Sequence, residues 1–260
     1  MLDSLMTNTP AWLLVFARMG GLLGMNPLFN RRNVPAMMRA GLIFLLTALI
    51  APGIAAESLG LDAMNSFELA VSMLKELFVG FACGYVFQVF YYMLFFAGDL
   101  MDTHFGMSMA KVFDPGTNIQ MSASGNLLNI LFALYILATD SHLLLIRIFT
   151  DSFQILPVGA VLISQEGARF FIDLFVSAFS LAMRLVFPFM AAEFVLELSM
   201  GILMKLIPQI HIFVINIQFK MLLGLILLLA FAAPVSSFLD NYMRIMLENL
   251  QYAFNALTPI

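Results

Sequence analysis

Long runs without charge are the feature that most constrains what this chain can fold into. Residues 77–98 contain no acidic or basic side chain, and neither do residues 40–56. As a helix, the first run is about 33 Å long, which matches the roughly 30 Å thickness of bilayer hydrocarbon. The chain is therefore predicted to lie in a membrane or to pack against equally apolar partners.

The composition excludes several classes of protein. Apolar residues make up 62% of the 260 residues and charged residues only 11%, whereas an average soluble domain is roughly 25% charged. The net charge is −4 and the longest basic stretch is Arg31-Arg32, so a nucleic-acid backbone has no basic surface to bind. We therefore exclude a soluble enzyme, a disordered protein and a nucleic-acid binder. Cys83 is the only cysteine, which excludes an intrachain disulfide, and the N-terminus lacks the basic region of a cleaved signal peptide.

Charges and turn residues divide the chain into apolar segments of helical length. No segment shows the sustained alternation of a β-strand, so the sequence predicts an all-α membrane-associated protein. Pro35 suits a helix start, Leu156-Pro157 suits a break, and residues 57–76 carry enough charge to predict a solvated connection. No linker or separate soluble domain is visible, so residues 1–260 are predicted to form a single domain.

Residues 106–126 differ from their apolar surroundings. They contain the turn signal Asp114-Pro115-Gly116, two further glycines and three serines, between two strongly apolar segments. Loops of this length inside a compact protein are usually functional or disordered. The segment is therefore predicted to be a long loop with a function of its own.

Charged residues interrupt the later apolar runs, so a simple topology based on the positive-inside rule fails there. Glu193 and Glu197 are four residues apart and share a helix face, and their nearest cations in sequence are Arg184 and Lys205. Lys220 interrupts the last long run. Intramembrane charges are functional candidates, and two readings stay open: proton or ion handling in a transporter, or buried pairs between subunits.

Motifs of catalysis and metal binding are absent from the sequence. The histidines His104, His142 and His211 lie far apart and are expected at helix ends rather than around a metal. Asp99 and Asp102 share a helix face and form either an acidic dyad or, as we favour, a solvated helix end. The spacings Gly20-x-x-x-Gly24 and Gly80-x-x-x-Gly84 permit close helix approach.

Several short motifs occur in a fixed order along nearly the whole chain. They are Val34-Pro35, Arg39-Ala40-Gly41-Leu42, Pro52, Gly80, Gly84, Gln88, Ala97-Gly98, Gly106-x-Ser108-x-Ala110, Phe113-Asp114-Pro115, His142-Leu143, Ser152-Phe153, Leu156-Pro157, Gly159, Pro208-Gln209 and Ile212-Phe213-Val214. With this order and spacing, the chain resembles the FliR/SctT-like family of the type III secretion export gate, and its flagellar members more than its injectisome members. It departs at Asn216-Ile217-Gln218, where many members have Gly-Phe-Pro, and at Lys205, which is commonly arginine.

The resemblance implies a fold and a role. Family members consist of bent helical hairpins that resemble a fusion of the FliP and FliQ folds. They assemble with FliP and FliQ into the channel that exports unfolded flagellar proteins across the bacterial inner membrane, in the flagellar basal body. The implied partners also include an FlhB-like switch subunit, an FlhA-like export component and membrane lipid. The resemblance implies no enzymatic activity, no cofactor and no metal. The alternative from the residues alone is a self-contained proton-coupled secondary transporter.

The resemblance also implies site residues. In the family, the loop equivalent to residues 106–122 projects into the pore and helps to plug it when closed. The matching plug residues are Met107, Met109, Phe113, Asp114, Pro115, Gly116 and Met121. Soft methionine and phenylalanine side chains suit a plug that must reseal around varied chains. The candidate buried charge pairs at subunit contacts are Arg184, Glu193, Glu197, Lys205 and Lys220.

Overall fold

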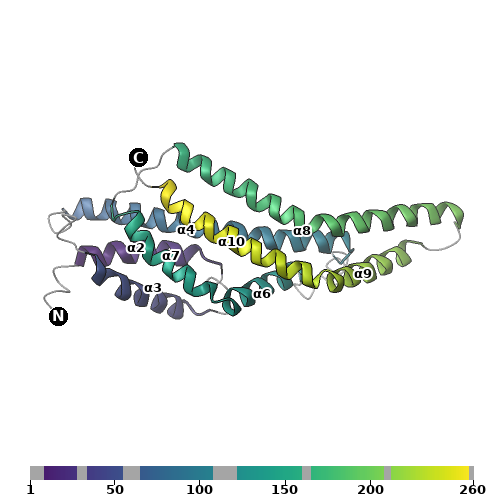
Figure 1. Cartoon of the computed structure of the whole chain (residues 1–260), viewed down its shortest axis with the longest axis horizontal. Coiled ribbons are helices and arrows are strands. Elements are labelled where there is room, and N and C mark those ends of the chain that lie inside the picture. Colours follow the sequence, from purple (N-terminus) through teal and green to yellow (C-terminus); the bar gives the residue numbers. More distant parts are fainter. Residues whose placement is uncertain are drawn as a thin grey trace. The chain divides into compact units, whose positions relative to one another are not determined.

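The computed structural model describes residues 9–27, 34–54, 65–107, 122–159, 165–207 and 212–257. Within these ranges the chain forms eight α-helices, one short 3-10 helix and no strand (Figure 1). They are α2 (Thr9–Met25), α3 (Ala36–Ile50), η1 (Ala51–Gly53), α4 (Ser66–His104), α6 (Ala123–Ala138), α7 (Ser141–Ile155), α8 (Gln165–Leu206), α9 (Ile212–Ala230) and α10 (Ala232–Ala256). The all-α class predicted from the sequence is confirmed.

Helix ends lie where the sequence changes character. α3 begins directly after Pro35, whose ring fixes φ near the value a helix needs. α7 ends at Ile155, just before the predicted break. Asp140 separates α6 from α7 with a φ of 54°, a conformation that aspartate tolerates better than most residues. α8 is longer than the apolar runs predict, because it continues through Pro188 and the charges that follow.

Three of the described helical segments are long and apolar enough to cross a membrane. They cover Ala36–Gly53, Ser66–His104 and Gly167–Leu206, with mean hydropathies of 1.7, 1.6 and 1.9. Two helix pairs, α6 with α7 and α9 with α10, also pass this test when each pair is taken as one broken span. The α9–α10 pair bends by 63° at its break. The predicted membrane protein is thus supported by helix length and composition.

The chain divides into two compact units. The first unit contains residues 1–90, 140–175 and 245–260, and the second contains residues 91–139 and 176–244. Three helices, α4, α8 and α10, contribute residues to both units. The segments of the two units alternate along the sequence, so neither unit is a continuous stretch of chain. The single domain expected for residues 1–260 stays a prediction.

A buried ion pair joins three helices of the first unit. The Nε of Arg18 on α2 lies 2.5 Å from Oε2 of Glu76 on α4, and both side chains are fully buried. Arg18 also donates from Nη1 to the carbonyl of Ser152 on α7, and the N–H of Gly159 donates to Oε1 of Glu76. The sequence placed Glu76 in a solvated connection. That prediction is wrong, because Arg18 supplies its counter-charge inside the unit.

Two glycines of α4 allow it to touch α2. A Cβ added to Gly80 would lie 2.8 Å from the backbone nitrogen of Leu22, and one added to Gly84 would lie 2.9 Å from the Leu22 carbonyl oxygen. A Cβ added to Gly20 or Gly24 would have nothing within 4 Å. Of the two predicted glycine spacings, the one on α4 therefore lies at a helix contact and the one on α2 does not.

Aromatic side chains make up much of the core of the second unit. The Phe189 ring of α8 lies 6.0 Å from the Phe105 ring and 5.1 Å from the Phe231 ring. Phe132 of α6 and Tyr242 of α10 meet edge to face at 5.9 Å. Such pairs stabilise a packed interior beyond their area burial.

We expect Gly80→Ala to destabilise the first unit and Gly20→Ala to be tolerated. Both changes add one methyl group to a glycine of a small-residue motif, but only the first meets backbone atoms that cannot move aside. The expected cost of Gly80→Ala is about 2–3 kcal/mol. Gly20→Ala is expected to be neutral or slightly stabilising, because alanine favours helix. Thermal unfolding of the detergent-solubilised protein measures both, and equal melting temperatures would contradict the glycine contact.

Candidate functional site at the C-terminal end of α4

The end of α4 is where most of the sequence-predicted residues can be compared with the structure. Of the predicted plug residues, Met107 lies half-buried in the turn that follows α4. Met109, Phe113, Asp114, Pro115, Gly116 and Met121 lie outside the described residues. The structure therefore describes the two helix ends that flank residues 108–121, and the plug itself stays a prediction.

A buried carboxylate joins these two helix ends. Asp102 of α4 is 1% exposed, and its Oδ2 accepts a hydrogen bond of 2.7 Å from the Ser122 hydroxyl. The backbone N–H of Ser124 donates to the same carboxylate at 3.2 Å. Ser122 is also the N-cap of α6, where its Oγ accepts from the Gly125 N–H at 2.9 Å. The negative charge lies at a helix N-terminus, which stabilises anions. We call Asp102, Ser122 and Ser124 the clasp.

Close backbone contact accompanies the clasp. A Cβ added to Gly98 of α4 would lie 2.6 Å from the carbonyl carbon of Ser124, and one added to Gly125 would lie 2.8 Å from the carbonyl oxygen of Phe95. Only glycine allows α4 and α6 to approach this closely. The clasp and the glycine pair together fix the start of α6 on the last turns of α4.

The last residues of α4 are also packed against α8 and α9. Phe105 is buried, and a Cβ on Gly224 of α9 would lie 2.5 Å from its ring. Gly106 follows with a φ of 73°, which turns the chain away from the helix axis. Glycine adopts this conformation without the steric strain that a Cβ would cause. Residues 104–106 therefore have a fixed position within the second unit.

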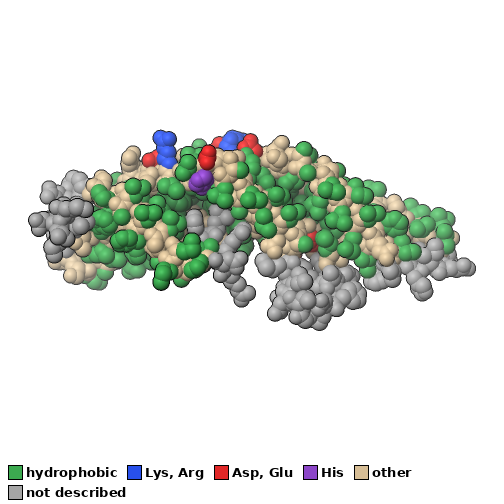
Figure 2. All heavy atoms as spheres, turned by 90° about the horizontal axis from the view of Figure 1, so that it is seen from below, with side chains coloured by type: hydrophobic (Ala, Val, Ile, Leu, Met, Phe, Trp, Pro, Cys, Tyr) green, Lys and Arg blue, Asp and Glu red, His purple; other side chains and the backbone are tan. Residues whose placement is uncertain are grey.

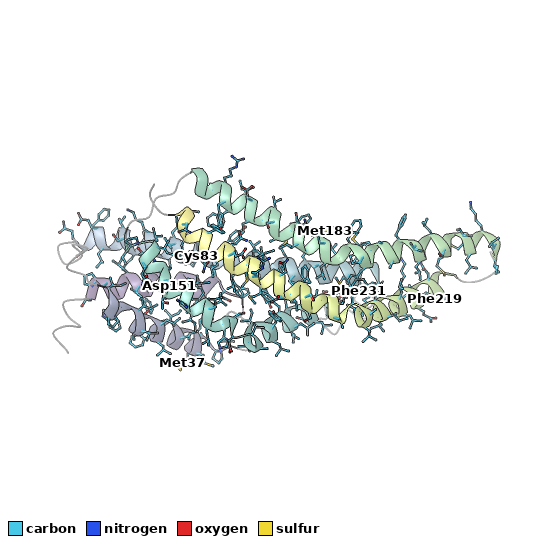
Figure 3. All side chains as sticks on the ribbon, in the orientation of Figure 1. Met37, Cys83, Asp151, Met183, Phe219 and Phe231 are labelled. Carbon is cyan, nitrogen blue, oxygen red and sulfur yellow. The ribbon has the colours of Figure 1, made fainter. Side chains whose placement is uncertain are left out.

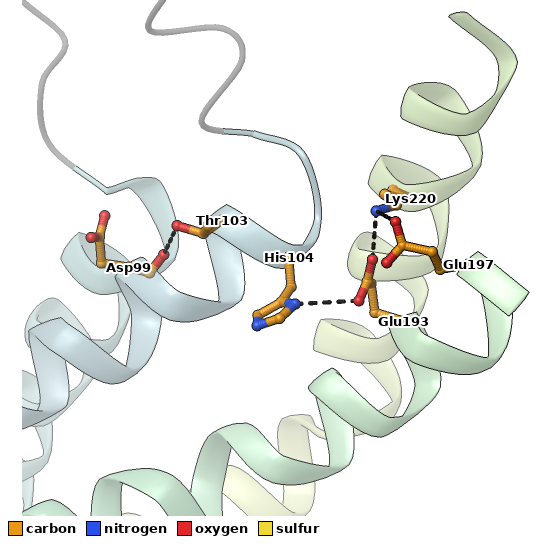
Figure 4. Close-up of polar contacts among 6 residues, drawn as sticks. All are labelled: Asp99, Thr103, His104, Glu193, Glu197 and Lys220. Carbon is orange, nitrogen blue, oxygen red and sulfur yellow. Dashed lines mark hydrogen bonds and ion pairs between the residues drawn. The ribbon is translucent and has the colours of Figure 1, made fainter. Parts of the chain in front are cut away.

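Four charged or titratable side chains meet beside this turn (Figure 4). Lys220 of α9 lies 2.6 Å from Oε1 of Glu193 and 3.2 Å from Oε1 of Glu197, both on α8. His104 of α4 lies 3.2 Å from the other carboxylate oxygen of Glu193 through Nδ1. Glu193 is 4% exposed, whereas more than half of the Glu197 side chain is exposed. We call His104, Glu193, Glu197 and Lys220 the charge cluster.

The structure brings together three of the five charges that the sequence nominated for subunit contacts. Lys220 meets Glu193 and Glu197, although it lies on the helix after α8. Arg184 and Lys205, the nearest cations in sequence, are exposed and have no ion-pair partner among the described residues. A contact of any of these charges with another subunit stays a prediction.

His104 lies at a helix end as expected, but sequence reasoning missed its contact with Glu193 and the role of Asp102. Asp102 was expected at a solvated helix end, but it is buried against α6. Its hydrogen-bond donors are Ser122 and Ser124, whereas the Asp99 carboxylate points away from the charge cluster in Figure 4. The available signal was the Ser122-x-Ser124-Gly125 start of α6, which is typical of a helix N-terminus that attracts a carboxylate.

The chemistry of this region is ion pairing and hydrogen bonding. In the part of the chain that the structure describes, no three histidine, cysteine or acidic side chains converge on a position that could hold a metal ion. Glu193 is instead surrounded by donors on α4 and α9. The site is thus suited to fixing helix ends relative to one another.

We expect Glu193→Gln to destabilise the second unit far more than Glu197→Gln. Glutamine at 193 leaves Lys220 with only one exposed partner, and breaking a buried pair costs roughly 3–5 kcal/mol when no partner remains. We expect about 2–3 kcal/mol for Glu193→Gln and below about 1 kcal/mol for Glu197→Gln, because exposed pairs contribute little. Chemical unfolding of the solubilised variants measures the difference, and a larger loss for Glu197→Gln would contradict it.

Comparisons with known proteins identify the family. The sequence model of the family described as "Bacterial export proteins, family 1" matches residues 9–246. The chain is 28% identical over 257 residues to the flagellar biosynthetic protein FliR of Bacillus subtilis strain 168, covering 96% of each chain. It is 25% identical to the FliR protein of Escherichia coli K12, and the match covers 86% of this chain and 85% of that protein. It is also 25% identical to the FliR protein of Aquifex aeolicus, and that match covers 92% of each chain. The match spans nearly every described helix, and the chain belongs to the bacterial export proteins of family 1.

Proposed function

We propose that this chain is a structural subunit of the flagellar type III secretion export gate in the bacterial inner membrane. The observation that carries the proposal is the family match over residues 9–246, together with relatives of nearly equal length that are named flagellar biosynthetic proteins. The role requires a rigid helical frame and no catalytic step. The exported cargo would be unfolded flagellar proteins.

The exposed apolar surface supports assembly with other subunits. Apolar side chains are spread over the described surface in Figure 2, and charged side chains are sparse on that face. Met37 on α3 is 86% exposed, and it and Phe219 on α9 project away from their helices (Figure 3). Exposed apolar area on this scale requires lipid or protein to cover it. We infer that FliP-like and FliQ-like gate subunits cover part of it, with an FlhB-like switch subunit and an FlhA-like component in the same apparatus.

Lys205 is the charge best placed for a subunit contact. It lies in a shallow groove on α8 with Phe194, Leu198, Gly201, Ile202 and Glu197. Glu193 and Lys220 compensate each other inside the chain, so they stabilise the α8–α9 hairpin that presents Lys205. A carboxylate on a neighbouring subunit is the partner that this lysine requires in an apolar contact.

The segment between α4 and α6 is the proposed plug of the closed pore. Its function is exclusion: a closed gate must stop ions and yet admit an unfolded chain of any sequence. Met107, Met109, Phe113 and Met121 supply adaptable apolar groups for that purpose. The clasp supports the proposal, because a plug needs ends that are attached to a rigid frame.

The rival function is a proton-coupled transporter that uses Asp99, Asp102, Glu193 or Glu197. A proton-carrying carboxylate must exchange with water, but Asp102 is 1% exposed and accepts hydrogen bonds from Ser122 and Ser124. Glu193 is buried against Lys220. These partners favour a structural role for both carboxylates.

We expect a tagged chain, expressed with its native neighbours and purified in mild detergent, to elute in one large complex. Mass determination should identify two other small hydrophobic gate proteins in it, because the exposed apolar faces of α3, α8 and α9 need covering. A particle of one or two copies of this chain alone would contradict the export-gate role and would favour the transporter.

We expect deletion of residues 108–120 to raise ion leak through assembled gates. The deletion removes most of the apolar plug groups, while the clasp keeps α4 and α6 in place and so preserves assembly. Conductance in bilayers measures the leak, and the mass of the complex serves as the assembly control. A glycine–serine segment of equal length in place of 108–120 should leak similarly, and unchanged leak and export in an intact complex would show that the plug assignment is wrong.

A further inference from the structure

Arg184 lies in an apolar groove on α8 and has no charged partner among the described residues. The groove has a volume of about 580 Å³ and is lined by Phe179, Ser180, Met183, Arg184, Phe187 and Pro188. Arg184 is exposed, and none of the ion pairs among the described residues includes it. The charge cluster does not use this arginine, and no described residue supplies a counter-charge for it.

The polar groups of the groove match a phosphodiester. Ser180 and Arg184 are four residues apart on one helix, so the hydroxyl and the guanidinium lie on the same face. A guanidinium binds two phosphate oxygens in parallel, and a hydroxyl can donate to a third. Pro188 has no N–H, so the Arg184 carbonyl lacks its usual helical donor and is left as an acceptor. A ligand that fits therefore carries both a phosphate and a hydroxyl group.

The length of α8 indicates where such a ligand would come from. A helix of 42 residues is about 63 Å long, roughly twice the thickness of bilayer hydrocarbon. Apolar side chains are exposed on both sides of Arg184, among them Val176 and Phe194. Where α8 crosses a bilayer, these side chains cannot all lie in hydrocarbon, so a level of lipid headgroups falls along the helix. Arginine is favoured at that level, where its charge stays in a polar environment.

We propose that this groove binds the headgroup of one anionic phospholipid of the phosphatidylglycerol class and so fixes the level of the bilayer on α8. The phosphate contacts Arg184 and Ser180, a glycerol hydroxyl donates to the Arg184 carbonyl, and an acyl chain lies along Met183 or Phe187. A carboxylate of a partner subunit would satisfy the guanidinium but offers no donor to that carbonyl. The proposal goes beyond the gate function, and it reassigns Arg184 from a subunit contact to a lipid contact.

The first test counts bound lipid. The complex that contains this chain is placed in nanodiscs of phosphatidylcholine with and without phosphatidylglycerol, and retained lipids are counted by native mass spectrometry after release into detergent. We expect R184Q to retain phosphatidylglycerol about tenfold less well than the unchanged protein, because charge-assisted hydrogen bonds are lost. R184K should fall between them. R169Q, which removes another exposed arginine of α8, is the matched control and should retain lipid normally. Equal retention in R184Q and R169Q would overturn the proposal.

The second test identifies the occupant directly. A photo-reactive phenylalanine analogue at Phe187, which is 67% exposed, should form an adduct with the mass of a phospholipid. An adduct with a neighbouring gate protein would show that a protein occupies the groove, and the lipid proposal would be wrong. That outcome would leave the gate function standing, because the gate function is decided by the composition of the purified complex. A phospholipid adduct on a chain that purifies without gate partners would support the lipid site alone.

Discussion

Arg18 and Glu76 lie fully buried among apolar helices, and the first unit depends on their pairing. Arg18 donates a hydrogen bond to the Ser152 carbonyl of α7, and Glu76 accepts one from the N–H of Gly159 in the turn after α7. One charge–charge contact therefore fixes several elements at once. Removing either partner would leave an uncompensated charge inside the unit, which costs roughly 3–5 kcal/mol. The glycine contacts of α4 add shape to this attraction, because they let α2 approach until backbone meets backbone. Charge thus selects the neighbours of α4, and glycine sets their distance.

The second unit uses the same principle with different groups. Lys220 compensates Glu193 across the α8–α9 hairpin, and His104 attaches the end of α4 to the same carboxylate. Asp102 has donors from the start of α6 in place of a basic partner. Each buried acid of this region therefore has its partners on a different helix. A membrane-embedded chain with few charges can use those charges as specific connectors, because apolar packing alone does not distinguish one helix face from another.

The helical class and most helix ends could be predicted from the sequence, because they depend on local features such as uncharged runs, Pro35 and the break at Leu156-Pro157. The site could be predicted only in part. Glu193 was nominated as a buried charge, but its partner lies on the next helix and not at the nearest cation in sequence. From the sequence, Asp102 is predicted to be a surface residue, because nothing local shows that the start of α6 faces it. Burial and pairing depend on which helix faces meet, and a single sequence does not encode that in any local pattern.

The clasp has a consequence for how this protein can change over time. Asp102 and Ser122 are 20 residues apart in sequence but joined by one hydrogen bond, so the chain between them begins and ends at nearly the same point. The length of that insert does not set the spacing of α4 and α6, which the clasp and the glycine pair maintain independently. Changes in the length of residues 108–121 are therefore not expected to disturb the packed helices, whereas Phe105 and Gly106 belong to the framework. The framework and the insert are thus free to evolve as separate modules.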